Sequence, residues 1–157
     1  MDFVLVVAGK NVATLAPIVY ANGASVVVNP DPERGQFSSL QVGLQEVLNR
    51  GRDTAIITLV DRPPATAVTV HTLRDAYEAA GHNIWAVVPE YSGKHGHPFV
   101  AGREMIAAFL QASPNSTARE VEHQHRDQIR YLAVDDPFVA ANINTPDDYA
   151  ALPGRSI

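Results

Sequence analysis

The sequence contains no cysteine. A disulfide framework, a cysteine-ligated zinc site, an iron–sulfur cluster and a cysteine nucleophile are therefore all excluded. No apolar run approaches the ~20 residues that a membrane-spanning helix needs, and the apolar stretch 3–8 is too short for the core of a signal peptide. We therefore expect a soluble cytosolic protein without a membrane partner.

Charge is also scarce in this chain. Charged residues make up 18% of the 157 residues, below the usual ~25%, and 12 basic against 17 acidic residues leave a formal net charge of −5. This acidic balance disfavours nonspecific binding to nucleic acid or to an anionic membrane. The hydrophobic fraction of 46% argues against disorder. A chain of this length is most simply one domain, residues 1–157.

Short apolar runs rich in Val and Ile alternate with stretches of helical periodicity. The runs are residues 3–8, 25–28, 54–60, 84–88, 98–101 and 129–134, and the helical stretches are 11–21, 39–49, 67–80 and 102–111. This alternation predicts an α/β fold in which a mostly parallel, Rossmann-like sheet lies between two layers of helices. Thr145 and Pro146 predict the start of a last helix, and residues 89–97 and 112–127 are expected to be flexible.

Ligands of open α/β sheets bind beyond the carboxyl ends of the strands, so the segments after the predicted strands are of most interest. Residues 29–40 follow one strand, with Gly35 in the loop and Ser38 or Ser39 available to cap the next helix. Free N–H groups at such a helix start favour an anion or a polar ligand. A capped loop without a ligand explains the same residues.

Asp61 directly follows another predicted strand and precedes Arg62 and two prolines. A carboxylate in this position suits Mg²⁺, which takes one or two protein carboxylates and completes its shell with phosphates and water. The alternative interpretation is a turn-forming Asp ahead of a proline pair.

Two glycines, at 93 and 96, allow a tight backbone path in residues 91–98. Lys94, His95 and His97 in this segment can face a phosphate or an acidic substrate. A solvated hairpin loop is the alternative.

Asn142 and Asn144 lie on the same side of an extended segment. Their amides can complete a metal shell or bind a ribose, and turn and capping chemistry is the alternative. His123 and His125 do not share one face of a helix, so they do not indicate a metal site. Neither a Walker loop nor a G-x-G-x-x-G motif is present.

In their order and spacing, these motifs resemble those of the nucleotidyltransferases that attach GMP or CMP to the molybdenum cofactor. That family belongs to a larger group of sugar-phosphate and alcohol-phosphate nucleotidyltransferases. The matching stretches are residues 29–35 with 38–40, then 59–63, 93–98 and 142–149. The resemblance covers nearly the whole chain from Phe3 on. It implies a three-layer α/β fold of the nucleotidyltransferase (nucleotide-diphospho-sugar transferase) type.

One part of the family pattern is absent from this sequence. The family begins with a strand and a Gly-rich loop of the form L-A-A-G-x-S-x-R-M-G-x-x-K, which cradles the triphosphate. Residues 3–24 instead resemble the second strand and helix of the family, so we expect an N-terminally truncated fold and weak triphosphate binding. Since the first strand of that fold is interior, its loss would expose a sheet edge. We therefore expect a rearranged sheet or a homodimer joined near residues 3–8.

The resemblance implies an Mg²⁺-dependent transfer of CMP or GMP from CTP or GTP to a phosphorylated pterin-like acceptor, with release of pyrophosphate. The implied metal ligands are Asp61 and Asn144. His97 and Lys94 are expected to face the acceptor as catalytic residues with Asp61. The expected nucleotide-binding residues are Asn29, Gly35, Gln36, Ser38, Ser39 and Asn142.

Two points stay open at the level of sequence. The segment 142–144 resembles the guanylyl-transferring branch, whereas the segments around Asn29 and His97 resemble the cytidylyl-transferring branch. The absent loop also favours an alternative function, a noncatalytic paralogue that binds a partner or a pterin-like ligand.

Overall fold

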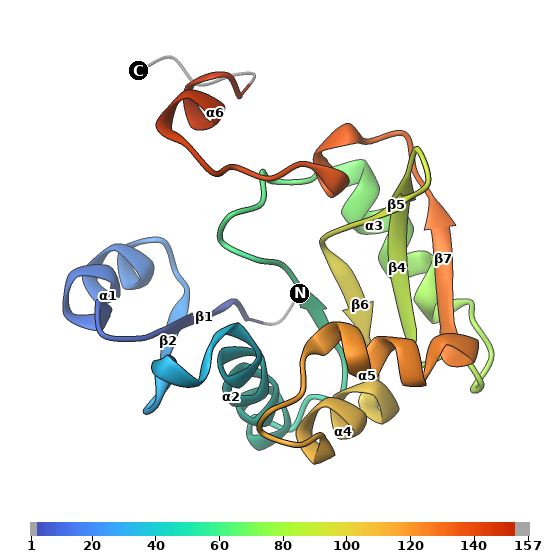
Figure 1. Ribbon diagram of the computed structural model, residues 1–157, viewed down its shortest axis with the longest axis horizontal. Helices are drawn as coiled ribbons and strands as arrows, with labels where there is room; N and C mark the ends of the chain where they lie inside the picture. The colour runs from blue at the N-terminus through green and yellow to red at the C-terminus, as the bar shows by residue number, and fades with distance from the viewer. Residues whose placement is uncertain (1–2, 153–157) are drawn as a thin grey trace. The chain divides into compact units, whose positions relative to one another are not determined.

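The computed structural model describes residues 3–152, in which helices and strands alternate along the chain (Figure 1). This alternation confirms the predicted α/β class. The chain forms two compact units, Met1–Ala55 with Arg103–Gln124 (unit 1) and Ile56–Gly102 with His125–Ile157 (unit 2). None of the helices within the described residues has the length and apolar character that crossing a membrane requires.

Unit 1 is built on two parallel strands, β1 (Leu5–Ala8) and β2 (Ser25–Val28), which are connected by helix α1 (Val12–Ala21). Helix α2 (Gln36–Asn49) packs closely on β1, because a Cβ atom at Gly43 would lie 2.9 Å from a methyl carbon of Val7. The glycine therefore sets how closely the helix approaches the strand.

Helices α4 (Arg103–Gln111) and α5 (Ala118–Gln124) complete unit 1. The Phe109 ring of α4 meets the Phe37 ring of α2 edge to face, with 6.2 Å between centroids. The Gln41 side chain of α2 donates a hydrogen bond of 3.0 Å to the carbonyl of Phe109. Helix α2 thus packs against both β1 and α4.

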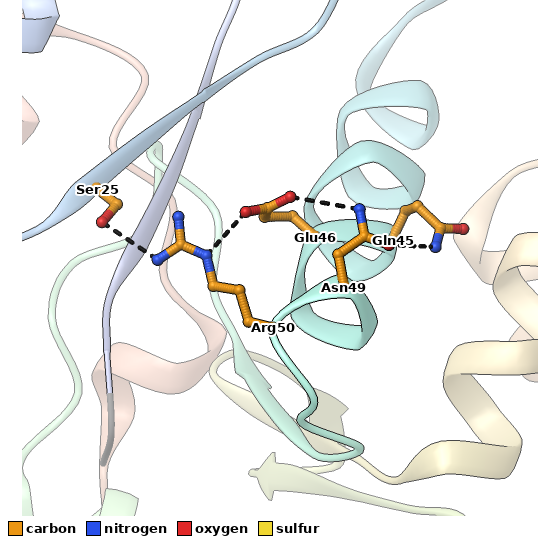
Figure 2. A network of polar contacts seen from close by, with 5 residues as sticks. All are labelled: Ser25, Gln45, Glu46, Asn49 and Arg50. Atoms are coloured by element: carbon orange, nitrogen blue, oxygen red, sulfur yellow. Dashed lines mark hydrogen bonds and ion pairs between the residues drawn. The ribbon is translucent and has the colours of Figure 1, made fainter.

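A polar network joins the carboxyl end of α2 to the start of β2 (Figure 2). Arg50 Nε donates to Glu46 Oε1 at 2.8 Å, and Arg50 Nη1 lies 3.4 Å from Ser25 Oγ. This bond to Arg50 is the largest cause of the lowered pKa of Glu46. The Arg50 guanidinium also lies over the Phe3 ring, 5.0 Å from its centroid. The arginine therefore connects α2 both to the start of β2 and to the segment that precedes β1.

Unit 2 contains the strands of the larger sheet. Its strands are β3 (Ala55–Ile57), whose first residue belongs to unit 1, β4 (Ala86–Tyr91), β5 (Lys94–His95), β6 (Phe99–Ala101) and β7 (Ile129–Ala133). Strand β4 pairs in parallel with β7 but antiparallel with β5 and β6. The sheet is therefore mixed and does not show the mostly parallel arrangement that was expected. Only a short loop and β5 separate β4 from β6, whereas a parallel return needs a connection of a dozen or more residues.

Helix α3 (Ala67–Glu78) covers this sheet in unit 2 (Figure 1). Its Leu73 packs against Val87 of β4 and Val100 of β6, and all three side chains are buried. A Cβ atom at Gly102 would lie 1.7 Å from the Tyr77 hydroxyl oxygen, so a larger residue just after β6 would have to displace the Tyr77 side chain of α3.

Two segments that were expected to be flexible contain regular structure. Residues 89–97 contain the end of β4, the turn at Ser92 and Gly93, and β5, and α5 occupies part of 112–127. Thr117 and Glu120 form a reciprocal capping box at the start of α5, with bonds of 2.8 and 3.2 Å. The polar composition of α5 conceals the helix, because Val121 is its buried residue. The predicted last helix is confirmed as α6 (Pro146–Ala150), capped by Thr145.

A buried carboxylate connects α3 to the segment that follows β7, where the short 3-10 helix η3 (Pro137–Ala140) begins. Asp136 is 1% exposed, and its Oδ2 accepts hydrogen bonds from Thr66 N–H at 2.9 Å and from the Thr69 hydroxyl at 2.7 Å. Its Oδ1 accepts from Phe138 N–H at 3.1 Å. Burial by itself raises the pKa of Asp136, but these hydrogen bonds outweigh it and hold the pKa below its usual value. The group is therefore a carboxylate at neutral pH.

We expect Asp136→Asn to lower the free energy of unfolding by about 3 kcal/mol, because an amide removes the charge and turns a donor toward Thr66 and Thr69. Urea denaturation at pH 7 measures the loss. Asp135→Asn is the matched control, since Asp135 is exposed and adjacent in sequence. Equal destabilisation by the two variants would show that the Asp136 bonds contribute nothing specific.

Candidate functional site

The segment 139–143 of unit 2 holds the loop that follows β3. The Ile143 N–H donates to the carbonyl of Asp61 at 2.8 Å. The Arg62 side chain donates from Nη1 to the carbonyl of Ala141 at 3.1 Å. Asp61 and Arg62 are therefore fixed at two alternate positions of one backbone segment.

The segment also holds the end of the β4–β5 hairpin. The His97 N–H donates to the carbonyl of Val139 at 2.9 Å, and the following peptide bond, His97–Pro98, is cis. A Cβ atom at Gly96 would lie 1.8 Å from the Val139 carbonyl oxygen, so no side chain fits there. The glycine lets the hairpin approach closely enough for His97 to reach its anchor.

Three buried side-chain atoms of these two loops lack a hydrogen-bond partner among the described residues: Asp61 Oδ1, Arg62 Nε and His97 Nδ1. Burial, and to a smaller extent the Arg62 charge, lower the pKa of His97 to about 4, although the Asp61 charge opposes the shift. The imidazole is therefore neutral at pH 7, and the charges of Asp61 and Arg62 both act on it. Sequence reasoning placed Asp61 and His97 in one site, and the structure brings them together.

The structure also places Asn142 and Asn144 beside this cluster, since Ile143 between them bonds to Asp61. Both asparagine side chains are exposed. The backbone N–H of Asn144 donates to Asp148 Oδ2 at 2.9 Å, and this bond contributes most to the lowered pKa of Asp148. The amide side chains are thus unobstructed at the edge of the site, and their predicted roles stay predictions.

Lys94 is exposed at the turn of the β4–β5 hairpin, opposite Tyr91 in the strand register. Its neighbour His95 stacks on the Tyr131 ring at 3.9 Å between centroids and approaches Glu90 Oε2 at 3.1 Å. The hairpin thus uses His95 for packing on β7. The proposed contact of Lys94 with an acceptor stays a prediction.

The predicted nucleotide-binding residues around Asn29 belong to unit 1. Asn29 is 3% exposed, and its Nδ2 donates to Ser38 Oγ at 2.8 Å and Ser39 Oγ at 3.0 Å. Asp31 N–H donates to Asn29 Oδ1 at 3.0 Å. Asn29 therefore joins the end of β2 to the first turn of α2.

The prediction that Ser38 or Ser39 caps this helix is wrong. Helix α2 begins at Gln36, and Gly35 occupies the N-cap position with a φ of +88°, which favours glycine. Ser38 instead donates from its hydroxyl to the Gly35 carbonyl at 2.7 Å. The positive φ of Gly35 turns the chain into the helix earlier than the apolar periodicity indicates. Gly35 and Gln36 are exposed, so their contact with a nucleotide stays a prediction.

The donors around Asp61 fit a divalent cation with a largely non-protein shell. Among residues 3–152, no three or more His, Asp or Glu side chains are grouped so that they could hold a metal. One buried carboxylate oxygen without a partner, with two amide side chains nearby, is what Mg²⁺ needs when phosphates and water complete its shell. Asp61 can therefore hold the metal, with an amide oxygen of Asn142 or Asn144 as a second donor.

Sequence reasoning missed Asp136, and it noted Arg62 as a positive charge beside the metal site without assigning it a role. The charge of Arg62 beside Asp61 is visible in the sequence, but its buried Nε follows only from packing. Asp136 precedes a proline and reads as a turn residue, whereas its side chain bonds Thr66 and Thr69 some seventy positions away. No local signal reports that contact.

We expect the stability that depends on His97 to fall as the pH falls. The folded-state pKa of about 4 lies below the ordinary 6.5, so between these values the unfolded chain binds the proton and folding loses about 1.4 kcal/mol per pH unit. In His97→Gln this contribution is absent. From pH 7 to pH 5, the difference in unfolding free energy between wild type and variant should therefore change by about 2 kcal/mol, to the disadvantage of the wild type. Parallel pH profiles for the two proteins would contradict a buried neutral His97.

Comparisons with known proteins identify structures that resemble this one and a family that the chain matches. The structure resembles the Rv0371c protein of Mycobacterium tuberculosis, with 27% identity and a TM-score of 0.76 over 96% of this chain and 74% of that one. A complex of Rv0371c with manganese has 25% identity and a TM-score of 0.74, over 96% and 76% of the two chains.

The molybdopterin-guanine dinucleotide biosynthesis protein A of Archaeoglobus fulgidus shares the fold at 16% identity, with a TM-score of 0.61 over 92% and 74% of the two chains. A search of the curated proteins gave no match. Residues 1–129 match the family described as the MobA-like NTP transferase domain, and the chain belongs to that family.

Proposed function

We propose that this protein is a divalent-cation-dependent nucleotidyltransferase that transfers CMP or GMP from CTP or GTP to a phosphorylated pterin-like acceptor such as the molybdenum cofactor. The observation that carries the proposal is the buried Asp61 oxygen without a partner, fixed beside Arg62 and His97. Membership of the MobA-like NTP transferase family supports the reaction class. The order of the motifs in the sequence supports the choice of acceptor.

The reaction needs positioning and charge neutralisation more than covalent participation by the protein. An oxygen of the acceptor phosphate attacks the α-phosphorus of the nucleotide, and the bond from that phosphorus to the bridging oxygen breaks, so pyrophosphate leaves with the electron pair. A bound Mg²⁺ supplies positive charge to the phosphates. Asp61 holds the metal, and Arg62 adds a fixed positive charge beside it.

The identity of the cation rests on the donor chemistry. A hard carboxylate oxygen and amide oxygens accept Mg²⁺ and Mn²⁺ alike. The structural neighbour Rv0371c was solved as a complex with manganese. We propose Mg²⁺ for this chain, because nucleotide triphosphates carry it.

Calorimetric titration with CTP and then GTP, each with Mg²⁺, tests this function. We expect Mg²⁺-dependent binding of one nucleotide, which names the base, and at least about tenfold weaker binding in Asp61→Asn because the metal loses its carboxylate. Asp135→Asn removes an exposed carboxylate of the same unit and should bind like wild type. A magnesium dependence unchanged in Asp61→Asn would remove Asp61 from the site.

A noncatalytic binding module is the second candidate, favoured by the absence of the Gly-rich triphosphate loop from the sequence. In that case neither nucleotide gives heat or a thermal shift at millimolar concentration. The same titration therefore separates the two candidates.

We also propose that the protein forms a homodimer through the free edge of β1. Ser25 and Asn29 N–H groups donate to the carbonyls of Val4 and Ala8, so the backbone groups of Leu5 face away from β2. Within the described residues, β2 is the strand paired with β1. An apolar edge of this kind pairs readily with a second strand.

Light scattering at micromolar concentration should show a dimer for wild type and a monomer for Val4→Lys, since a lysine at an exposed edge opposes pairing. Val60→Lys changes a fully exposed valine of unit 2 and should stay dimeric. A wild-type monomer would end the proposal.

A further inference from the structure

The three atoms without partners, on Asp61, Arg62 and His97, differ in what they need. The carboxylate oxygen only accepts hydrogen bonds or binds a cation, and the guanidinium Nε–H only donates. The neutral imidazole does either, depending on which nitrogen carries its proton. Leaving such groups buried without partners costs free energy, which a ligand that supplies the partners recovers.

One hydrogen bond positions the Arg62 side chain and leaves one of its buried donors without a partner. Its Nη1 is bonded to the Ala141 carbonyl at 3.1 Å, which fixes the guanidinium plane and leaves Nε as the buried donor without a partner. Anionic oxygens are the natural acceptors for this group, because a charged donor and a charged acceptor form the stronger hydrogen bonds.

His97 is held at the end of the β4–β5 hairpin by two contacts. Its backbone N–H donates to the Val139 carbonyl at 2.9 Å, and its ring meets the Phe99 ring edge to face, with 5.5 Å between centroids. The Nδ1 atom of this ring is buried and has no hydrogen-bond partner among the described residues. A ring nitrogen in this state can donate or accept one hydrogen bond, depending on the tautomer.

We infer that Arg62 and His97 together form an oxyanion subsite that binds an oxygen of a phosphate group, next to the divalent cation on Asp61. This inference rests on the proposed function, and it names what that function leaves open, namely where a phosphate is held. The phosphate comes either from the acceptor or from the nucleotide, and the chemistry of recognition is the same. All three atoms are buried in this structure, so binding requires a movement that exposes them.

The charged side chains around the subsite suit a phosphate that binds together with a divalent cation. Asp61 contributes a carboxylate, and Arg62 contributes a guanidinium that is always protonated in proteins. Asp136, the other buried carboxylate of unit 2, is committed to hydrogen bonds from Thr66, Thr69 and Phe138. A phosphate alone would be repelled by the Asp61 charge, whereas a phosphate with Mg²⁺ brings a negative charge to Arg62 and a positive charge to Asp61.

Binding of two phosphate probes to the full chain with Mg²⁺ tests the inference. Pyrophosphate stands for the nucleotide end, and phenyl phosphate stands for a phosphomonoester acceptor. Histidine ring nitrogens are followed by NMR, and the His97 signals are assigned by their loss in His97→Gln. We expect at least one probe to shift the His97 signals in wild type, and Arg62→Gln to weaken that binding by about tenfold to a hundredfold.

Arg130→Gln is the matched control, because it removes the same charge from an exposed position on β7 of the same unit and should bind like wild type. Dependence on Arg62 for pyrophosphate alone assigns the subsite to the nucleotide, and dependence for phenyl phosphate alone assigns it to the acceptor. Equal binding by Arg62→Gln and wild type, or unmoved His97 signals at saturation with both probes, overturns the inference. The proposed function survives that result if nucleotide binding still depends on Asp61 and Mg²⁺.

Discussion

The arrangement of the site depends on the buried carboxylate of Asp136. Taking a charge out of water is costly, and the cost is met here only because three donors converge on the two oxygens. Those donors come from the start of α3 and the start of η3. Once they are fixed, the chain that follows must run past the loops that precede α3 and β6. The path of segment 139–143, and with it the position of Asp61, Arg62 and His97, follows from that one interaction.

The order of most elements could be predicted because most strands have a local signature in the sequence. The two-residue strand β5 was not predicted, since it lies in a segment that was expected to be flexible. The run 25–28 matches β2, and the helical spacing at 67–80 matches α3 closely. Strand direction was less accessible, since the antiparallel pairing of β4 and β6 depends on the length of their connection. Helix α5 was missed because its polar face dominates its composition, although the Thr117 and Glu120 capping pair was readable.

The positions of the site residues could be predicted from the sequence, whereas the hydrogen-bond partners of their side chains could not. Asp61, His97 and the asparagines stand in loops that follow strands, and topology alone brings such loops together at one edge of a sheet. The condition of their atoms, paired or unpaired, is set by packing over long sequence distances and has no local signature. Asn29 illustrates the reverse case: its position suggests a ligand contact, but its side-chain amide is already used to hold Ser38 and Ser39.

Segment 139–143 holds the two loops through its backbone and leaves two of its neighbouring side chains without a structural role. Its anchors to the two loops fall at Val139, Ala141 and Ile143, all through backbone atoms of the segment. The side chains of Asn142 and Asn144 take no part in these anchors and are exposed. A substitution at 142 or 144 therefore leaves the backbone positions of Asp61, Arg62 and His97 in place. The fold thus separates the atoms that fix the loops from the side chains that can vary beside them.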